Sequence, residues 1–258
     1  MDLDIAGLRV LVTAGAGGIG REIARAFVAE GARVHVCDVD ERALEELGRS
    51  DPKLSRSRCD VASRPEVARL FDDTLQALGG LDVLVNNAGI AGPTGLVEEI
   101  NPEDWDRCLE VCITGQFNCA RLAVPHLKQS RNASMVNLSS AAGKFAFPLR
   151  SPYAAAKWGV IGFTKSLARE LGEFGIRVNA ILPGLVEGDR IRRVLESKAQ
   201  VRGISFREVE DEAVAYTSMR TMVTAQQLAD QIVFLCSSRG RTISGQALSI
   251  DGDTQMLP

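Results

Sequence analysis

The stretch RVLVTAGAGGIGREIARAFVAE, residues 9–30, decides the fold of this chain. It passes from an apolar, β-branched segment through a glycine-rich turn into an amphipathic segment. Gly15, Gly17 and Gly20 have a GxGxxG spacing, which is weak alone and strong where a strand ends and a helix begins. Such a loop brings backbone N–H groups close to a pyrophosphate. We predict a dinucleotide-binding βα unit; a purely structural turn is the alternative. The loop residues expected to bind the cofactor are Thr13, Gly15, Gly17, Gly18, Ile19 and Gly20.

Short apolar runs alternate with amphipathic stretches along the whole chain, which is typical of βαβ units. The expected strands are Val10–Val12, Val34–Cys37, Leu54–Cys59, Val83–Val85, Met135–Leu138, Val178–Leu182 and Ala247–Ile250. Their continuous apolar character suits strands covered by helices on both faces. No linker or repeat interrupts the pattern. We therefore predict one α/β domain over residues 1–258, with a doubly wound, Rossmann-type parallel sheet of about seven strands.

Local signals mark the starts of several helices. Ser63 and Glu66 have the spacing of a capping box, and Thr224 with Gln227 repeats it. Residues 184–222 break the alternation, since a connection between a strand and the next helix is normally brief. They predict two charged helices, at Asp189–Gln200 and Ser205–Tyr216. We interpret 184–222 as a substrate lid; a peripheral helical pair without a ligand is the alternative.

The composition is that of an ordinary globular protein, with 45% hydrophobic and 24% charged residues. A net charge of −3 provides no basic field for a phosphate backbone, so we expect no nucleic-acid partner. No apolar run reaches the roughly 20 residues of a membrane helix, and MDLDIAGLRV at the start lacks a signal-peptide pattern. We expect no membrane association.

Six cysteines are scattered without a CxxC pair, and the chain has two histidines, so no metal site is expected. Free cysteines usually lie in a core. The pattern indicates a reducing, cytoplasmic compartment. Cys108, Cys112 and Cys119 could share one helical face, where a thiolate site is the alternative to a buried face of small apolar residues.

Asp38 follows the second expected strand. A carboxylate there accepts hydrogen bonds from the adenosine ribose and repels a 2′-phosphate. No Arg or Lys occupies the glycine loop to attract that phosphate. NAD is therefore the predicted cofactor, in preference to NADP. A turn or helix-capping role beside Asp40 is the alternative.

Tyr153 and Lys157 lie four residues apart, on one face of a helix that Ser151-Pro152 is expected to cap and begin. The ammonium and the positive end of the helix both favour a phenolate. A tyrosine in that setting can act as general acid and base for an alcohol proton. Tyrosine and lysine at this spacing also occur by chance, so a surface pair is the alternative.

Together these motifs resemble the short-chain dehydrogenase/reductase family over nearly the whole chain. The matching pieces are TAGAGGIG (13–20), Asp60-Val61, NNAG (86–89), Ser140, YAAAK (153–157), RVNAILPG (177–184) and Ile250-Asp251-Gly252. Several ordered motifs are far more specific than any one of them. The resemblance implies an oxidoreductase that acts on CH–OH groups.

The resemblance also implies a role for each matching residue. Ser140 would hydrogen-bond the substrate oxygen, with Ser139 as its rival. Tyr153 would exchange the hydroxyl proton, and Lys157 would bind the nicotinamide ribose. The other residues expected near the cofactor are Asp60 and Val61 at the adenine, Asn87, Ala88 and Gly89 in the cleft, and Pro183 and Gly184 beside the nicotinamide.

Three residues depart from the family pattern. Ala14 replaces the usual first glycine of the loop, and we expect the neighbouring Gly15 to supply the conformational freedom. Gly188 stands where a threonine often binds the nicotinamide amide. Cys112 stands where a catalytic asparagine is usual, so the catalytic set is reduced to Ser140, Tyr153 and Lys157.

We predict hydride transfer between NAD(H) and a small secondary alcohol or ketone. A 3-ketoacyl-carrier-protein reductase shares these motifs but usually prefers NADP. A catalytically idle NAD-binding sensor is the other alternative, suggested by Cys112.

Two further expectations concern assembly and substrate. The resemblance implies a homotetramer, through the helices containing Trp105 and Trp158, although core packing also explains both residues. A group of arginines could bind an anionic substrate. The alternative, which is commoner for such residues, is a charged helix face in contact with solvent. These arginines are Arg150, Arg190, Arg192 and Arg193.

Overall fold

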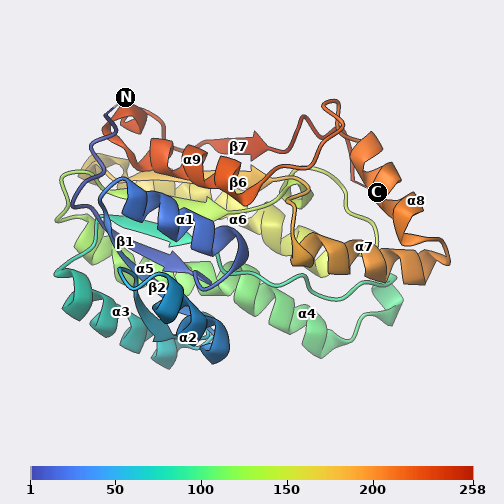
Figure 1. The fold of residues 1–258 in the computed structure, drawn as a ribbon, viewed down its shortest axis with the longest axis horizontal. Coiled ribbons are helices and arrows are strands. Elements are labelled where there is room, and N and C mark those ends of the chain that lie inside the picture. The colour runs from blue at the N-terminus through green and yellow to red at the C-terminus, as the bar shows by residue number, and fades with distance from the viewer. Residues whose placement is uncertain (1, 258) are drawn as a thin grey trace.

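The computed structural model describes residues 2–257 and folds them around one parallel sheet (Figure 1). The strands are β1 (Arg9–Thr13), β2 (Arg33–Asp38), β3 (Ser55–Arg58), β4 (Val83–Asn86), β5 (Ser134–Leu138), β6 (Arg177–Pro183) and β7 (Ala247–Ile250). They pair in the order β3-β2-β1-β4-β5-β6-β7, each pair parallel. The predicted doubly wound α/β fold is confirmed, and all seven expected strands are present.

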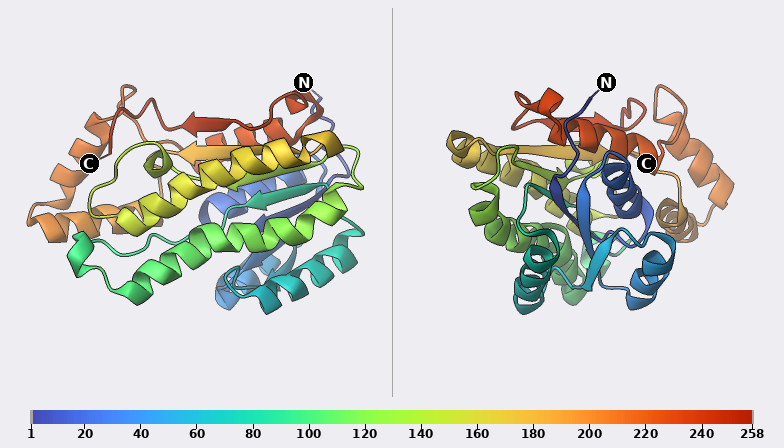
Figure 2. Two further views of the ribbon diagram at one scale, coloured as in Figure 1. Left: turned by 180° about the vertical axis from the view of Figure 1, so that it is seen from behind. Right: turned by 60° about the vertical axis from the view of Figure 1, so that its left-hand side comes forward.

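Helices cover both faces of the sheet (Figures 1 and 2). They are α1 (Gly18–Ala29), α2 (Glu41–Ser50), α3 (Arg64–Leu78), α4 (Pro102–Leu109), α5 (Gly115–Leu127), α6 (Ser151–Leu171), α7 (Asp189–Arg202), α8 (Phe206–Ala215) and α9 (Ala225–Cys236). Figure 1 shows α1 and α9 on the near face. The view from behind in Figure 2 shows α4, α5 and α6 across the other face. Among the described helices, none is long and apolar enough to cross a membrane.

The core consists of two apolar layers that the sheet separates. Successive strand residues point to opposite faces. In β1, therefore, Val10 and Val12 join one layer, under α1, α2 and α9, while Leu11 joins the other, under α3, α5 and α6. Because both faces are buried, the central strands read as continuous apolar runs rather than as alternating ones.

Two predicted helix starts need correction. The Ser63 hydroxyl accepts a hydrogen bond from the Glu66 N–H, but the Glu66 carboxylate accepts from the Asp60 N–H at 2.8 Å. The capping box is therefore only half formed there, whereas the box of Thr224 and Gln227 is complete.

The predicted cap at Ser151 was wrong. Arg150 is the N-cap of α6, because its φ of −134° and ψ of 34° are not helical, and its side chain makes no capping bond. Ser151 is thus already helical, and its buried hydroxyl has no hydrogen-bond partner among the described residues. Tyr153 still lies in the first turn of α6, as expected.

Residues 184–222 form the two expected helices, α7 and α8. These helices pack on each other around a small apolar cluster that includes Leu195 and Val209. Figure 1 shows them beyond the end of the sheet at which β6 finishes. Residues 184–222, which the sequence predicts to act as a lid, are called the lid below.

Candidate active site

A cleft of about 730 Å³ lies at the carboxyl ends of the strands. It is lined by the glycine loop after β1, by segments after β4 and β5, by the start of α6 and by the first turns of α7. The strand order reverses between β1 and β4 at this place. Open α/β sheets bind their ligands in such a crevice.

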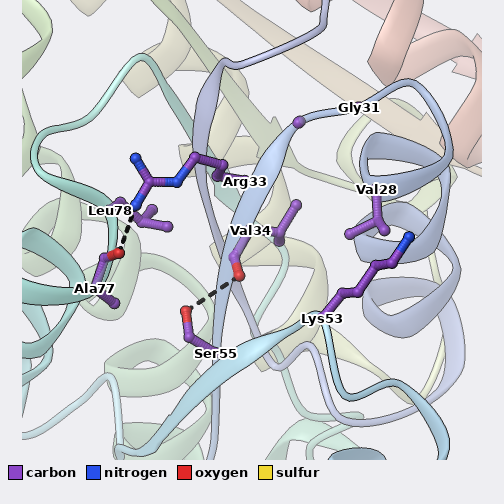
Figure 3. A pocket seen from close by; sticks show the side chains of 9 residues that line it. Val28, Gly31, Arg33, Val34, Lys53, Ser55, Ala77 and Leu78 are labelled. Atoms are coloured by element: carbon purple, nitrogen blue, oxygen red, sulfur yellow. Dashed lines mark hydrogen bonds between the residues drawn. The ribbon is translucent and has the colours of Figure 1, made fainter.

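A second hollow, of about 390 Å³, lies at the opposite edge of the sheet (Figure 3). Arg33 and Val34 line it from the start of β2, and Ser55 from the start of β3. Their polar atoms are used locally: Arg33 donates to the Ala77 carbonyl and Ser55 to that of Val34. This hollow therefore belongs to the amino-terminal edge, away from the residues predicted to be functional.

The glycine loop has the close packing that a dinucleotide site requires. A β-carbon on Gly20 would lie 2.1 Å from the Ala14 carbonyl oxygen, so only glycine fits. At Gly17 and Gly18, by contrast, an added β-carbon would meet nothing within 4 Å. Both residues line the cleft at the N-terminus of α1. The open space above this backbone fits the pyrophosphate of the expected cofactor.

Some residues predicted to bind the cofactor instead hold the loop in place. The Thr13 hydroxyl accepts hydrogen bonds from the N–H groups of Asn87 (3.0 Å) and Ala88 (2.9 Å). The Asn87 side chain donates back to the carbonyls of Thr13 and Ala14. Thr13, Gly15 and Ala88 are absent from the lining of the cleft, whereas Asn87 and Gly89 belong to it.

Asp38 lies at the end of β2 and lines the cleft. Its carboxylate accepts from the N–H groups of Ala16 and Asp40, both at 3.2 Å. The side chain that caps α2 is that of Asp40. Asp38 therefore does not cap the helix, but its bond from the Asp40 N–H forms a turn, as the alternative foresaw, and its carboxylate also lies beside the glycine loop.

Asp60 and Val61 do not line the cleft in this structure. The Asp60 carboxylate accepts from the Arg107 guanidinium at 2.7 Å and from the Ala62 N–H at 3.0 Å. Val61 is buried in the core layer under α3 and α5.

The rival serines after β5 have different surroundings. Ser139 is buried, and its hydroxyl donates to the Lys157 carbonyl at 2.7 Å, which ties β5 to α6. The half-buried Ser140 lines the cleft, and its oxygen accepts only from the Ala142 N–H, at 3.1 Å. The Ser140 hydroxyl proton is therefore available to a substrate oxygen, which is the role that the resemblance implies.

Tyr153 and Lys157 lie together in the cleft, on the first turns of α6. The Lys157 ammonium is buried, donates to the Leu138 carbonyl at 2.6 Å and lies 5.6 Å from the Tyr153 ring centroid. The Tyr153 ring stays half-buried and packs edge-on against Phe147. This arrangement offers a proton donor next to a fixed positive charge, beside the dinucleotide loop.

The helix that carries Cys112 is wider there than an α-helix. Residues Glu110–Thr114 form a π-helical turn between α4 and α5. Such turns are frequent at functional sites. Cys108 and Cys112 pack against Ala156 of α6, whereas Cys119 joins the core under the sheet. The three thiols are all buried but belong to two clusters, so they form no common site.

Cys112 lies behind the cleft rather than in its lining. Its thiol donates to the Ile90 carbonyl, with 3.4 Å between sulfur and oxygen. The pKa of Cys112 is lowered to about 6, first by a hydrogen bond from the Cys108 thiol and then by the Lys157 ammonium. The sequence suggested no such cause, because Lys157 comes from a different helix.

Three side chains of the lining surround or cover the Tyr153 ring, and two of them, Phe147 and Leu257, were not predicted. Phe147 and Leu257 pack around Tyr153, and Arg150 lies over both aromatic rings. No motif marks the first two, because a loop and the chain end bring them there. Arg150 could be found only as one arginine among several. Within residues 2–257 no cluster of His, Cys, Asp or Glu could hold a metal ion.

Comparison with known families places the chain among oxidoreductases. A family model described as enoyl-(acyl carrier protein) reductase matches residues 14–253. The 3-oxoacyl-[acyl-carrier-protein] reductase of Thermotoga maritima is 34% identical over 250 residues, which cover 94% of this chain and 95% of that one. The 2-(R)-hydroxypropyl-CoM dehydrogenase of Xanthobacter autotrophicus is 34% identical, covering 94% and 96%.

Solved structures agree on the fold and differ in cofactor. NAD+-bound xylitol dehydrogenase superimposes with a TM-score of 0.92 at 27% identity, covering 96% of this chain and 99% of the other. A variant of actinorhodin polyketide ketoreductase with NADPH gives a TM-score of 0.89 at 34% identity, covering 95% and 96%.

Proposed function

Because the chain belongs to the short-chain dehydrogenase/reductase family of oxidoreductases, we propose that it exchanges a hydride between NAD(H) and a secondary alcohol or ketone. The proposal rests on one observation: Ser140, Tyr153 and Lys157 line the same cleft as the glycine loop. An idle NAD-binding sensor would have no need of a hydroxyl and a phenol at that place.

The protein's part in the reaction is to hold the substrate oxygen and move its proton. Ser140 donates a hydrogen bond to that oxygen, and Tyr153 gives it a proton during reduction or takes one during oxidation. Lys157 stabilises the phenolate by charge, and its tie to Leu138 keeps it in place. When bound, NAD supplies the hydride chemistry.

The choice of NAD over NADP rests on charges beside Asp38. Arg21 on α1 also lines the cleft, but its guanidinium is already paired with Asp51 at 2.8 Å. Arg25 pairs with the same carboxylate, and the two guanidiniums hold the pKa of Asp51 well below its usual range. Arg21 is therefore engaged, while the Asp38 carboxylate would repel a 2′-phosphate.

Substituting Tyr153→Phe tests the proposed chemistry. The variant should lose at least about 100-fold in kcat, because general acid–base catalysis of this kind contributes that much or more. NADH binding, followed by fluorescence titration, should stay within a factor of about two, since the ring and Lys157 remain. A variant that retained most of its activity would overturn the mechanism.

A 3-ketoacyl-carrier-protein reductase is the second candidate, favoured by the family model and by the Thermotoga relative. Kinetics with both cofactors separate the two candidates. The proposed enzyme should use NADH well, and Asp38→Ala should weaken NADH binding and improve the use of NADPH. A parent protein that used NADPH far better than NADH would favour the second candidate.

We also propose that the enzyme is a cytoplasmic homotetramer. All six cysteines are free and buried, which suits a reducing compartment. Trp158 on α6 is 53% exposed and Phe117 on α5 is 42% exposed. Figure 2 shows these two helices across the same face of the sheet, seen from behind. Large exposed apolar side chains on one face are typical of an interface between subunits.

A further inference from the structure

Within residues 2–257, Arg150 is the largest fully buried side chain, with 2% of its surface exposed. One guanidinium nitrogen donates to the Ala91 carbonyl, and Nε has no hydrogen-bond partner among the described residues. None of the ion pairs formed within residues 2–257 includes Arg150. A guanidinium stays charged at any working pH, and a buried charge without a counter-ion is costly.

A second guanidinium converges on the same place from the lid. Arg190, in the first turn of α7, donates to the Gly89 carbonyl at 3.1 Å, and no carboxylate pairs with it among the described residues. The guanidinium carbons of Arg150 and Arg190 lie 5.5 and 5.9 Å from the Tyr153 ring centroid. Their mutual repulsion adds to burial in lowering the pKa of Arg150.

The surrounding charges do not offset these two cations. Lys157 adds a third positive charge, with its ammonium 5.6 Å from the Tyr153 ring centroid. The nearby lid carboxylates, Glu187 and Asp189, line the cleft but form no ion pair with either arginine. Within residues 2–257, the substrate end of the cleft thus presents two guanidiniums and the Lys157 ammonium, and no carboxylate forms an ion pair with them.

We propose that the substrate is a small anion whose negative group binds Arg150 and Arg190 while Ser140 and Tyr153 hold its reacting oxygen. This inference rests on the proposed dehydrogenase function. Both guanidiniums lie close to the Tyr153 ring, so only a few bonds separate the negative group from the reacting carbon. Hydroxy acids and their keto counterparts have this chemistry, and a sulfonate or phosphate in place of the carboxylate shares it.

Arg150 and Arg190 play different parts in binding the anion. Arg150 is held by Ala91 at the base of the cleft, with Nε still free to donate. Arg190 is exposed and lies on the lid. Its bond to Gly89 can be exchanged for a stronger, charge-assisted bond to the substrate anion.

Matched substrates and matched arginine variants test the inference. The parent protein is assayed with NAD and three- to five-carbon hydroxy acids, their methyl esters, and hydroxyalkyl sulfonates and phosphates. At least one anion should exceed its neutral counterpart about 100-fold in kcat/KM. Arg190→Met should lower kcat/KM for the anion about 10- to 100-fold, and for the ester by about threefold at most.

Arg192→Met is the control, since Arg192 lies on the same helix, is exposed and is absent from the lining of the cleft. It should leave both substrates unaffected. Arg150→Lys, which retains a charge, accompanies Arg150→Met in case the latter does not fold. Calorimetric binding of acid and ester to the NADH-loaded protein gives a readout that is independent of turnover.

The possible outcomes separate the two proposals. The anion site would be overturned if neutral alcohols were turned over as fast as anions, or if Arg190→Met lowered kcat/KM equally for both. The proposed dehydrogenase function would stand in either case. No turnover of any alcohol or ketone would overturn the dehydrogenase. In that case, tighter binding of the acid than of the ester would still support the anion site.

Discussion

Two residues that depart from the family pattern have a backbone explanation. Ala14 adopts a φ of +49°, in the left-handed region, so Ala14 itself, and not Gly15, makes the turn that a glycine usually makes. This conformation costs about 1–2 kcal/mol for a residue with a β-carbon. At Gly188 φ is +137° and ψ is 179°, a conformation open essentially to glycine alone. A threonine there would require a different path for the lid.

At Cys112 we expect the side chain to matter little for catalysis. The thiol faces the Ile90 carbonyl rather than the cleft, so Cys112→Ala should change kcat by less than about threefold. Full burial should also keep its labelling by iodoacetamide slow.

Cys119→Ala is the matched control, because Cys119 is equally buried but packs under the sheet. Both variants should lose about 1 kcal/mol in the free energy of unfolding, in line with a small core truncation. A large loss of kcat in Cys112→Ala alone, with its fold unchanged, would show that the thiol takes part in the reaction.

His35 predicts a pH dependence of stability. Burial lowers its pKa to about 4, and its ring nitrogens contact the hydroxyls of Ser55 and Ser57. Because the folded protein resists protonation, stability is complete above the unfolded pKa of about 6.5 and falls as the pH drops towards 4. His35 alone should lower the free energy of unfolding by about 2 kcal/mol between pH 7 and pH 5.

Urea titrations at the two pH values measure this loss. His35→Gln should remove that part of the dependence, whereas His126→Gln, at the only other histidine, should retain it. The same pH dependence in His35→Gln as in the parent would mean that other groups cause it.

Among the elements, the lid should change its dynamics on binding. It has a small apolar cluster of its own, and it meets the rest of the cleft through Arg190 and the bridge between Val186 and Val223. Ligands in the cleft would contact α7 and stabilise this arrangement. Amide hydrogen exchange over 189–215 should therefore slow when NADH and a substrate analogue are both present.

The exchange of α3, which is remote from the lining of the cleft, should stay the same in that experiment. If the substrate anion binds Arg190, NADH alone should slow amide exchange in the lid only in part. If amide exchange over residues 184–222 did not change in the ternary complex, the lid interpretation would be rejected in favour of a peripheral helical pair.

For the whole molecule, the proposed tetramer predicts that a charge at Trp158 weakens association. Trp158→Glu should give smaller species by light scattering at micromolar concentration, because a carboxylate would be buried in the interface. Met219→Glu is the control, since Met219 is 69% exposed on the loop after α8. If the parent and both variants have the same particle mass in solution, α6 does not form the interface.

The fold of the sheet was predictable because the sequence signals for its strands and covering helices are local. Apolar runs, glycine spacing and capping residues lie within a few positions of the element that they specify, as in residues 9–30. Helix boundaries were less predictable: the start of α6 depends on the dihedral angles of Arg150. The half-formed box at Ser63 depends on the approach of the Asp60 backbone to Glu66.

By itself, then, the sequence determined the family, the parallel sheet, the glycine loop and the pair of Tyr153 with Lys157, all of which rest on short spacings along the chain. The tertiary structure alone decided which of two neighbouring serines keeps a hydroxyl proton for a substrate and why the pKa of the Cys112 thiol is lowered. It also decided that Arg150 and Arg190 meet over one ring. The physical reason is that burial, pairing and charge depend on groups from distant segments, whose contacts arise only when the sheet and its loops have packed.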